Sequence, residues 1–224
     1  MAAVLGHQEP ILAGNQIMLR IYSMIAAGLV AALLGGLGYM MLRGPGDSGF
    51  AQCRTSQIAG GSGAIGGPFE LVDHTGRTVT DESLLTRPTL IYFGYAFCPD
   101  VCPLDANRNA LAADQLHNDG YDLQPVFISV DPRRDTPEVL ADFVSFMHPE
   151  MVGLTGTEEQ IREAARAYRA YYAIHDQDDD EFYLIDHSTF SYLLLPGHGF
   201  VEVFRRDLTP EDLAEQVACF IDAA

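Results

Sequence analysis

The strongest constraint on the fold is a cysteine pair placed directly behind an apolar segment. Residues 89–95 (TLIYFGY) are almost continuously apolar, β-branched or aromatic, which is typical of a strand buried on both faces. Cys98 and Cys102 follow at once, and Pro103 suits the first turn of a helix that we expect to run to about His117. The pair therefore lies between a strand and a helix, where open α/β sheets gather their ligand sites.

The chain after residue 67 alternates between strand and helix patterns, which predicts an α/β fold with a central mixed sheet. A hairpin is expected first, turning at residues 73–76 (DHTG). Strands are predicted at 69–72, 77–80, 125–130, 182–186, 192–195 and 200–204, and helices at 136–147, 157–168 and from 209 onward. Residues 43–67 are rich in glycine and poor in large apolar side chains, which indicates a tether.

The segment Ile21–Leu42 has 22 residues without a charge, between Arg20 and Arg43. A helix needs about 20 apolar residues to cross a bilayer, whereas a signal peptide has an apolar core of about 7–15. We therefore predict a single uncleaved transmembrane anchor. Residues 68–224 would form the folded domain behind it.

The orientation of this anchor is poorly set by charge, because arginines flank it on both sides. Four cysteines favour an oxidising compartment for the domain, outside the cytoplasm. Residues 1–20 would then be a short cytoplasmic N-terminus, and the domain would lie in the periplasm. A bacterial inner membrane is favoured over a mitochondrion because these 20 residues contain one Arg and one Glu, unlike an Arg-rich presequence.

The formal net charge of −18 excludes nucleic acid as a partner, because phosphate binding requires basic side chains to neutralise it. All 13 basic residues are arginine. The acidic run at 176–181 has no ordered ligand spacing, and we interpret it as solvated surface.

The cysteine pair allows several chemistries. The N-terminus of the following helix favours the thiolate, which is both a nucleophile and a metal ligand. A static disulfide is the structural alternative. Thioredoxin-type reductases have two residues between their cysteines, whereas Cys98 and Cys102 are separated by three, so both sulfurs can face one centre. Two thiolates suit copper(I) and equally suit zinc.

His187 is the best candidate for a third ligand. It follows a predicted strand in the sequence YLIDHS, where polar neighbours can fix its tautomer. A lone histidine is more often structural than a ligand, so this signal alone is moderate. The other histidines are predicted in turns, helix ends and loops or before the anchor: His7, His74, His117, His148, His175 and His198.

Four motifs in the same order resemble the signature of the Sco/SenC family. They are YFGYAFCPDVCP at 92–103, VDPRRDT at 130–136, GLTG at 153–156 and DHS at 186–188. The resemblance runs from about Gly66 to the C-terminus, and the N-terminal anchor agrees with it. Ala96 stands where the family often has threonine.

The resemblance implies a thioredoxin-like fold with an N-terminal β-hairpin, preceded by one transmembrane helix. It implies one copper ion on Cys98, Cys102 and His187. It also implies a role at the binuclear copper site of a haem-copper (cytochrome c) oxidase, either delivering copper or reducing the site's cysteines. Asp131 and Asp135 would be supporting or partner-facing residues rather than ligands.

Cys53 and Cys219 are outside this signature. We hypothesise that they form a structural disulfide between the tether and the last helix. Two independent thiols are the alternative, and the spacing does not decide between them.

Two functions compete on the same residues. A metallochaperone would hold copper on Cys98, Cys102 and His187 and pass it on by ligand exchange. A thiol-disulfide oxidoreductase would attack a partner disulfide through Cys98 and resolve through Cys102, without needing the histidine. A peroxidase or redox sensor ranks below both, because no Thr-x-x-Cys motif precedes the pair. Expected partners are the copper-site subunit of the oxidase and other periplasmic copper carriers or thiol reductants.

Overall fold

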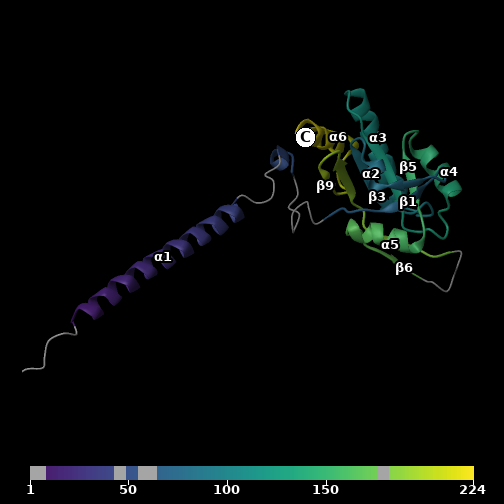
Figure 1. Cartoon of the computed structure of the whole chain (residues 1–224). Helices are drawn as coiled ribbons and strands as arrows, with labels where there is room; N and C mark the ends of the chain where they lie inside the picture. Colours follow the sequence, from purple (N-terminus) through teal and green to yellow (C-terminus); the bar gives the residue numbers. More distant parts are fainter. Residues whose placement is uncertain (1–8, 43–48, 55–64, 176–181) are drawn as a thin grey trace, which may run out of the picture. The chain divides into compact units, whose positions relative to one another are not determined.

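The protein is described by a computed structural model over residues 9–42, 49–54, 65–175 and 182–224 (Figure 1). Most of the predicted tether, the acidic run at 176–181 and His7 lie outside the described residues. The chain divides into two compact units, Met1–Ser48 and Gly49–Ala224, and each is described by itself.

The first unit contains the helix α1, Glu9–Leu42. Within it, Arg20–Tyr39 is long and apolar enough to cross a membrane, with a mean hydropathy of 1.9 and none of the segment buried. The helix starts earlier than the predicted segment at Ile21. Pro10 in its first turn is compatible with a helix start, since that position needs no amide donor.

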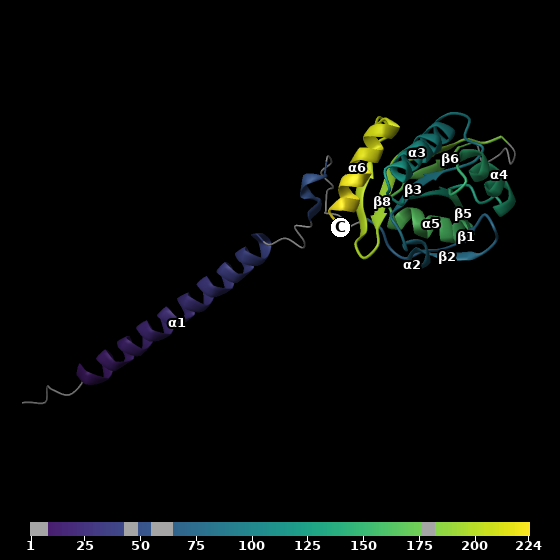
Figure 2. The ribbon, with the colours of Figure 1, turned by 90° about the horizontal axis from the view of Figure 1, so that it is seen from above.

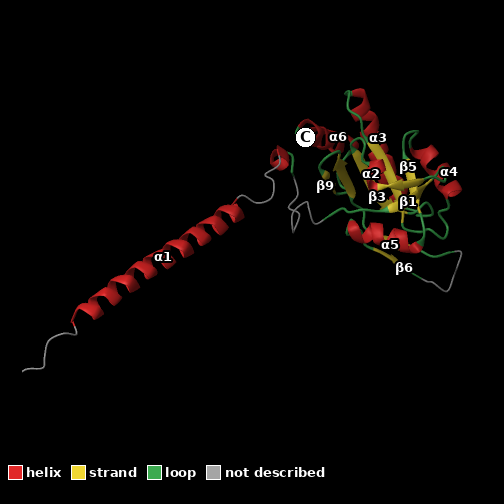
Figure 3. Ribbon diagram, in the orientation of Figure 1, coloured by secondary structure: helices red, strands yellow, loops and turns green. Residues whose placement is uncertain are grey.

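The second unit is built on a seven-stranded mixed sheet in the order β2-β1-β5-β4-β3-β8-β9 (Figure 3). The strand β3 lies in the interior of the sheet, parallel to β4 and antiparallel to β8, and all six of its residues are buried as the sequence predicts. The strands are β1 (Glu70–Asp73), β2 (Thr78–Thr80), β3 (Thr89–Gly94), β4 (Gln124–Ser129), β5 (Val152–Thr155), β8 (Ser191–Leu195) and β9 (Gly199–Phe204). A separate two-stranded ladder pairs β6 (Tyr172–Ile174) with β7 (Ile185–His187).

Helices cover both faces of the sheet, and β3 shows the alternation. Tyr92 points to α3 (Val101–Asn118), where its hydroxyl donates to Asp105. Phe93 points to the other face and packs against Tyr168 at the end of α5 (Glu158–Ala167). Figure 2 shows α6 beside α3. The remaining helices are α2 (Asp81–Leu84), α4 (Pro137–Met147), α6 (Pro210–Asp222) and the short 3-10 helix η1 (Gly49–Gln52). The predicted α/β fold with its N-terminal hairpin is confirmed.

The segment Gly49–Cys53 departs from the expected tether. Phe50 is buried against Phe220 of α6, and Cys53 is joined to Cys219 by a disulfide. The compact unit therefore begins at Gly49 rather than at residue 68. The disulfide between Cys53 and Cys219 agrees with the hypothesis drawn from the sequence, whereas the burial of Phe50 was not predicted.

Candidate metal centre

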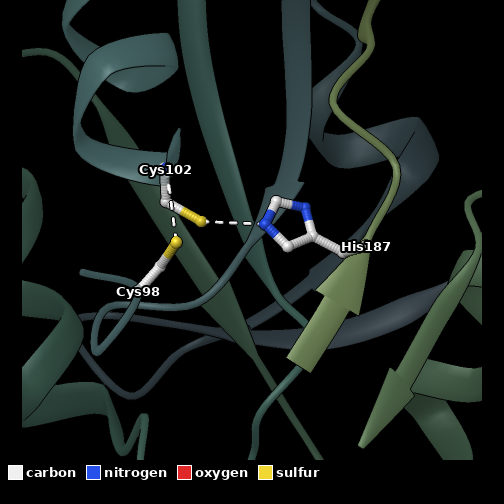
Figure 4. Close-up of side chains that lie close together, drawn as sticks. All are labelled: Cys98, Cys102 and His187. Carbon is white, nitrogen blue, oxygen red and sulfur yellow. Dashed lines mark hydrogen bonds between the residues drawn. The ribbon is translucent and has the colours of Figure 1, made fainter. Parts of the chain in front are cut away.

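Cys98, Cys102 and His187 meet at the carboxyl end of β3 (Figure 4). Cys98 lies in the loop after β3, Cys102 in the first turn of α3, and His187 at the end of β7. The Sγ atom of Cys102 is 3.1 Å from Nε2 of His187, and the three ligand atoms all lie within 4.8 Å of one another. No other group of three or more metal-ligating side chains comes together in the part of the chain that the structure describes.

The sulfur of Cys102 packs closely against Gly94 at the end of β3. A Cβ atom added at Gly94 would lie 2.9 Å from Sγ of Cys102 and 3.0 Å from the rings of Tyr92 and Phe127. The amide of Tyr95 donates to the same sulfur over 3.5 Å. Since any larger residue would displace the sulfur, the glycine at the end of β3 is part of the site. Sequence reasoning missed this role, although the motif contains the residue.

Cys98 caps the helix that follows it. The N-cap residue Asp100 makes no side-chain cap hydrogen bond, and the amide of Cys102 donates instead to Sγ of Cys98 over 3.4 Å. Helix N-termini have free amide donors and partial positive charge, which stabilise a thiolate. The helix α3 begins at Val101, so Pro103 lies in its first turn, as the sequence predicts.

The two thiols differ in acidity. Hydrogen bonding from the Cys102 thiol, and then from His187 and the helix amides, lowers the pKa of Cys98 to about 3 against the opposing effect of burial. Burial, and then the hydrogen bond to Cys98, raises the pKa of Cys102 far above its ordinary value. Cys98 is therefore a thiolate at neutral pH, and Cys102 holds the proton. Both are free thiols in this structure, so the pair does not form the static disulfide that the sequence left open.

His187 presents one fixed nitrogen to the sulfurs. Its Nδ1 lies 2.9 Å from the carbonyl oxygen of Ser188, which can only accept, so in the neutral ring Nδ1 carries the proton and Nε2 has the lone pair. Nε2 donates to the Cys98 thiolate only when the ring is protonated. Burial alone would lower the pKa of His187, but hydrogen bonding to the Cys98 thiolate raises it overall. Cys102 is the nearer sulfur, while the charge is on Cys98. The rings of Tyr92 and Tyr95 meet the imidazole edge-on at 6.0 and 5.8 Å.

This donor set fits a soft, low-coordinate metal ion. Two sulfurs and one imidazole with its lone pair facing them match the preferences of copper(I), and zinc would accept the same atoms. Cys102 is fully buried and Cys98 is 9% exposed, so Cys98 is the less deeply buried of the two cysteines.

Asp131 and Asp135 lie behind the site and do not join the ligands. The carboxylate of Asp135 accepts hydrogen bonds from the amide of Ala96 and the hydroxyl of Ser129. Asp131 accepts from Tyr183 and Arg134. Both aspartates are fully buried, so their role is support rather than partner contact. The motif gave no signal for Tyr183, which lies outside it.

The remaining sequence-predicted residues lie elsewhere. Cys53 and Cys219 form their disulfide in a second hydrophobic cluster, with α3, α6 and β9. Among the other histidines, His148 contacts Asp114, His175 contacts Asp186, and His74 accepts from the amide of Gly153.

Comparison with known proteins decides the family. The SCO1/SenC family profile matches residues 58–222, nearly all of the second unit. The chain belongs to the SCO1/SenC family. Protein SenC of Rhodobacter capsulatus is 54% identical to it over 174 residues, which is 78% of either chain.

Solved SCO1/SenC structures have the same fold. The crystal structure of Arabidopsis thaliana ScoI with copper bound is 40% identical, with a TM-score of 0.67 over 71% of this chain and 99% of that one. Yeast Sco1 with copper bound is 36% identical, with a TM-score of 0.68 over 72% of this chain and 90% of that one. These similarities confirm the thioredoxin-like architecture predicted from the motifs.

Proposed function

We propose that this protein is a copper metallochaperone. It binds one copper ion through Cys98, Cys102 and His187 and supports assembly of the binuclear copper site of a haem-copper oxidase. The observation that carries the proposal is the convergence of two free thiols and one oriented imidazole within 4.8 Å. Relatives solved with copper bound support the choice of metal. Copper is here the cargo, and a recipient's ligands would reach it from the side of Cys98, the less buried of the two cysteines.

Copper stoichiometry of the reduced full-length chain in detergent, loaded without oxygen, tests this proposal. We expect one copper per chain, lost in Cys98→Ser and weakened in His187→Ala. Retention of less than half an equivalent by the parent would overturn the carrier function. Asp73→Asn is a matched control, because its carboxylate is buried on β1, three strands from β3.

A thiol-disulfide reductase is the second candidate, favoured by the unequal thiols. The Cys98 thiolate would attack a partner disulfide, breaking its S–S bond and forming a mixed disulfide. Cys102, on losing its proton, would then attack Sγ of Cys98, releasing the partner as two thiols and leaving a Cys98–Cys102 disulfide. His187→Ala separates the functions: a reductase keeps exchanging disulfides, whereas the carrier loses affinity.

We propose further that α1 anchors the protein in a bacterial inner membrane with the second unit in the periplasm. The apolar segment Arg20–Tyr39 supports the anchor. The Cys53–Cys219 disulfide supports the compartment, because such bonds persist in oxidising surroundings. In spheroplasts, added protease should degrade the second unit. Protection until the membrane is permeabilised would contradict this orientation.

A further inference from the structure

We propose that the loop at residues 131–135, the bridging loop, is a positioning device that sets His187 against the two cysteines, with Arg134 as its central residue. The inference rests on the copper site proposed above, and it concerns what keeps His187 at a fixed position relative to the two cysteines. No step of metal transfer is assigned to the loop itself.

The two halves of the site belong to different parts of the fold. Cys98 and Cys102 follow β3 in the seven-stranded sheet, whereas His187 ends β7 in the separate ladder. One long hydrogen bond of 3.4 Å runs from the amide of Ile185 to the hydroxyl of Tyr95. Strand pairing with β3 therefore does not place the histidine, and another connection is required.

The bridging loop holds the cysteine half through its last residue. Asp135 accepts from the amide of Ala96 at 2.8 Å, two residues before Cys98, and from the hydroxyl of Ser129 at 2.5 Å. Because Asp135 is fully buried, these bonds are shielded from water and fix the loop to the backbone that leads into Cys98.

The same loop holds the histidine half through a closed triangle of side chains. Asp131 accepts from the hydroxyl of Tyr183 at one oxygen and from Nε of Arg134 at the other, both at 2.5 Å. Nη1 of Arg134 donates to the carbonyl oxygen of Tyr183 at 3.0 Å. Tyr183 lies two residues before β7, so the triangle fixes the approach of the chain to His187.

Arg134 also contacts aromatic rings from both halves. Its guanidinium carbon is 3.6 Å from the ring centre of Tyr183 on the histidine side. It is 5.3 Å from the ring centre of Phe97, the neighbour of Cys98. Both distances are within cation–π range. A planar guanidinium stacks and donates in fixed directions at once, which a lysine cannot do.

Copper(I) affinity, measured by competition with a chelator on the reduced full-length chain, tests this role. We expect Arg134→Ala and Asp131→Asn to weaken binding by about 10- to 100-fold, as loss of ligand-orienting partners does. Asp73→Asn is the matched control, since it also removes the charge of a buried aspartate paired with an arginine. It should bind copper as the parent does.

A double-mutant cycle shows whether the effect passes through His187. In a His187→Ala background, Arg134→Ala should weaken copper binding no further. Unchanged affinity in Arg134→Ala, or an equal loss with and without the histidine, would overturn the positioning role. Tyr183→Phe, which removes one hydroxyl, takes the place of Arg134→Ala if that variant does not fold.

A metal-free measurement separates this inference from the proposed function. In the reduced apo chain, amide hydrogen exchange at residues 185–188 should accelerate in Arg134→Ala and not in Asp73→Asn. If the parent binds no copper, the proposed function fails. The hydrogen-exchange rates alone then test whether the bridging loop positions His187. Unchanged exchange at these amides would contradict it.

Discussion

At the scale of single residues, the unequal thiols are the feature with the clearest chemical consequence. Cys98 is held as a thiolate by the Cys102 thiol, His187 and the start of α3. Cys102 is fully buried and keeps its proton. Before any metal binds, Cys98 therefore carries the negative charge and is the nucleophile, while Cys102 is a neutral thiol that can become a second sulfur ligand on losing its proton.

The alkylation rate of Cys98 should be independent of pH well below neutrality. With its pKa lowered to about 3, the rate of reaction with iodoacetamide should stay level from pH 8 to pH 5. An ordinary thiol, with a pKa of about 8.5, loses about tenfold per pH unit over that range. Cys102→Ala removes the main hydrogen bond and should move the profile to higher pH. A parent profile that falls throughout this range would contradict the assignment.

Gly94→Ala should damage the site more than the fold. Its new Cβ would lie 2.9 Å from Sγ of Cys102, so the sulfur or the backbone at Gly94 must shift. Overpacking of this kind costs about 1–3 kcal/mol of stability, and copper affinity should fall with it. Gly67→Ala is the control, because its Cβ would meet Ala167 at an ordinary 3.4 Å. Equal copper affinity in the two variants would contradict the role given to Gly94.

At the scale of elements, the site combines residues next to the seven-stranded sheet with a histidine from the separate β6–β7 ladder. β3 and α3 bring the cysteines together by local structure alone. β7 brings the histidine from a ladder of two three-residue strands, and the bridging loop connects the two parts.

Asp135 should make stability fall as the pH rises from about 4 to 7. Burial raises the pKa of its carboxyl to about 6 despite the hydrogen bond from Ser129, whereas an unfolded aspartate has a pKa of about 3.9. Between these values the folded state keeps a proton that the unfolded state has lost. The contribution is therefore complete below about pH 4 and is lost as the pH rises through about 6.

Urea unfolding of the parent and Asp135→Asn across this range measures the effect. The parent's stability relative to the variant should fall by roughly 2 kcal/mol between pH 4 and 7, since each pKa unit is about 1.4 kcal/mol and part of the change lies below pH 4. A difference that is constant or grows with pH would show that Asp135 titrates normally.

The sequence predicted what local patterns encode and missed what tertiary contacts impose. The apolar run at 89–95 predicted β3, and the strand-to-helix turn predicted where the cysteines would lie. The strand expected at 182–186 is found at Ile185–His187, because Tyr183 is held by Asp131 and Arg134 instead of a neighbouring strand. The short β5, β6 and α2 were not predicted, since three or four residues do not establish a period.

At the scale of the whole molecule, the Cys53–Cys219 disulfide joins the start of the second unit to its last helix across 166 residues. Phe50 packs between His198 and Phe220 beside it. The sequence suggested the pairing only as a hypothesis, because spacing says nothing about which loops come together.

Removing this disulfide should destabilise the second unit and leave the metal centre intact. A loop this long contributes about 4–5 kcal/mol in the chain-entropy model, so Cys53→Ser with Cys219→Ser should lower the unfolding midpoint clearly. Copper stoichiometry should not change, because the two cysteines belong to the second hydrophobic cluster rather than to the site. Free thiols should be counted on the unfolded parent under conditions that leave the Cys53–Cys219 disulfide untouched while Cys98 and Cys102 are thiols. We expect two free thiols, and a count of four would contradict the disulfide.

The most direct test of the central claim is X-ray absorption at the copper edge of the reduced, copper(I)-loaded full-length chain. We predict a shell of two sulfurs and one nitrogen, with the multiple scattering of an imidazole ring that disappears in His187→Ala. A shell without imidazole in the parent, or one with fewer than two sulfurs, would contradict the site formed by Cys98, Cys102 and His187.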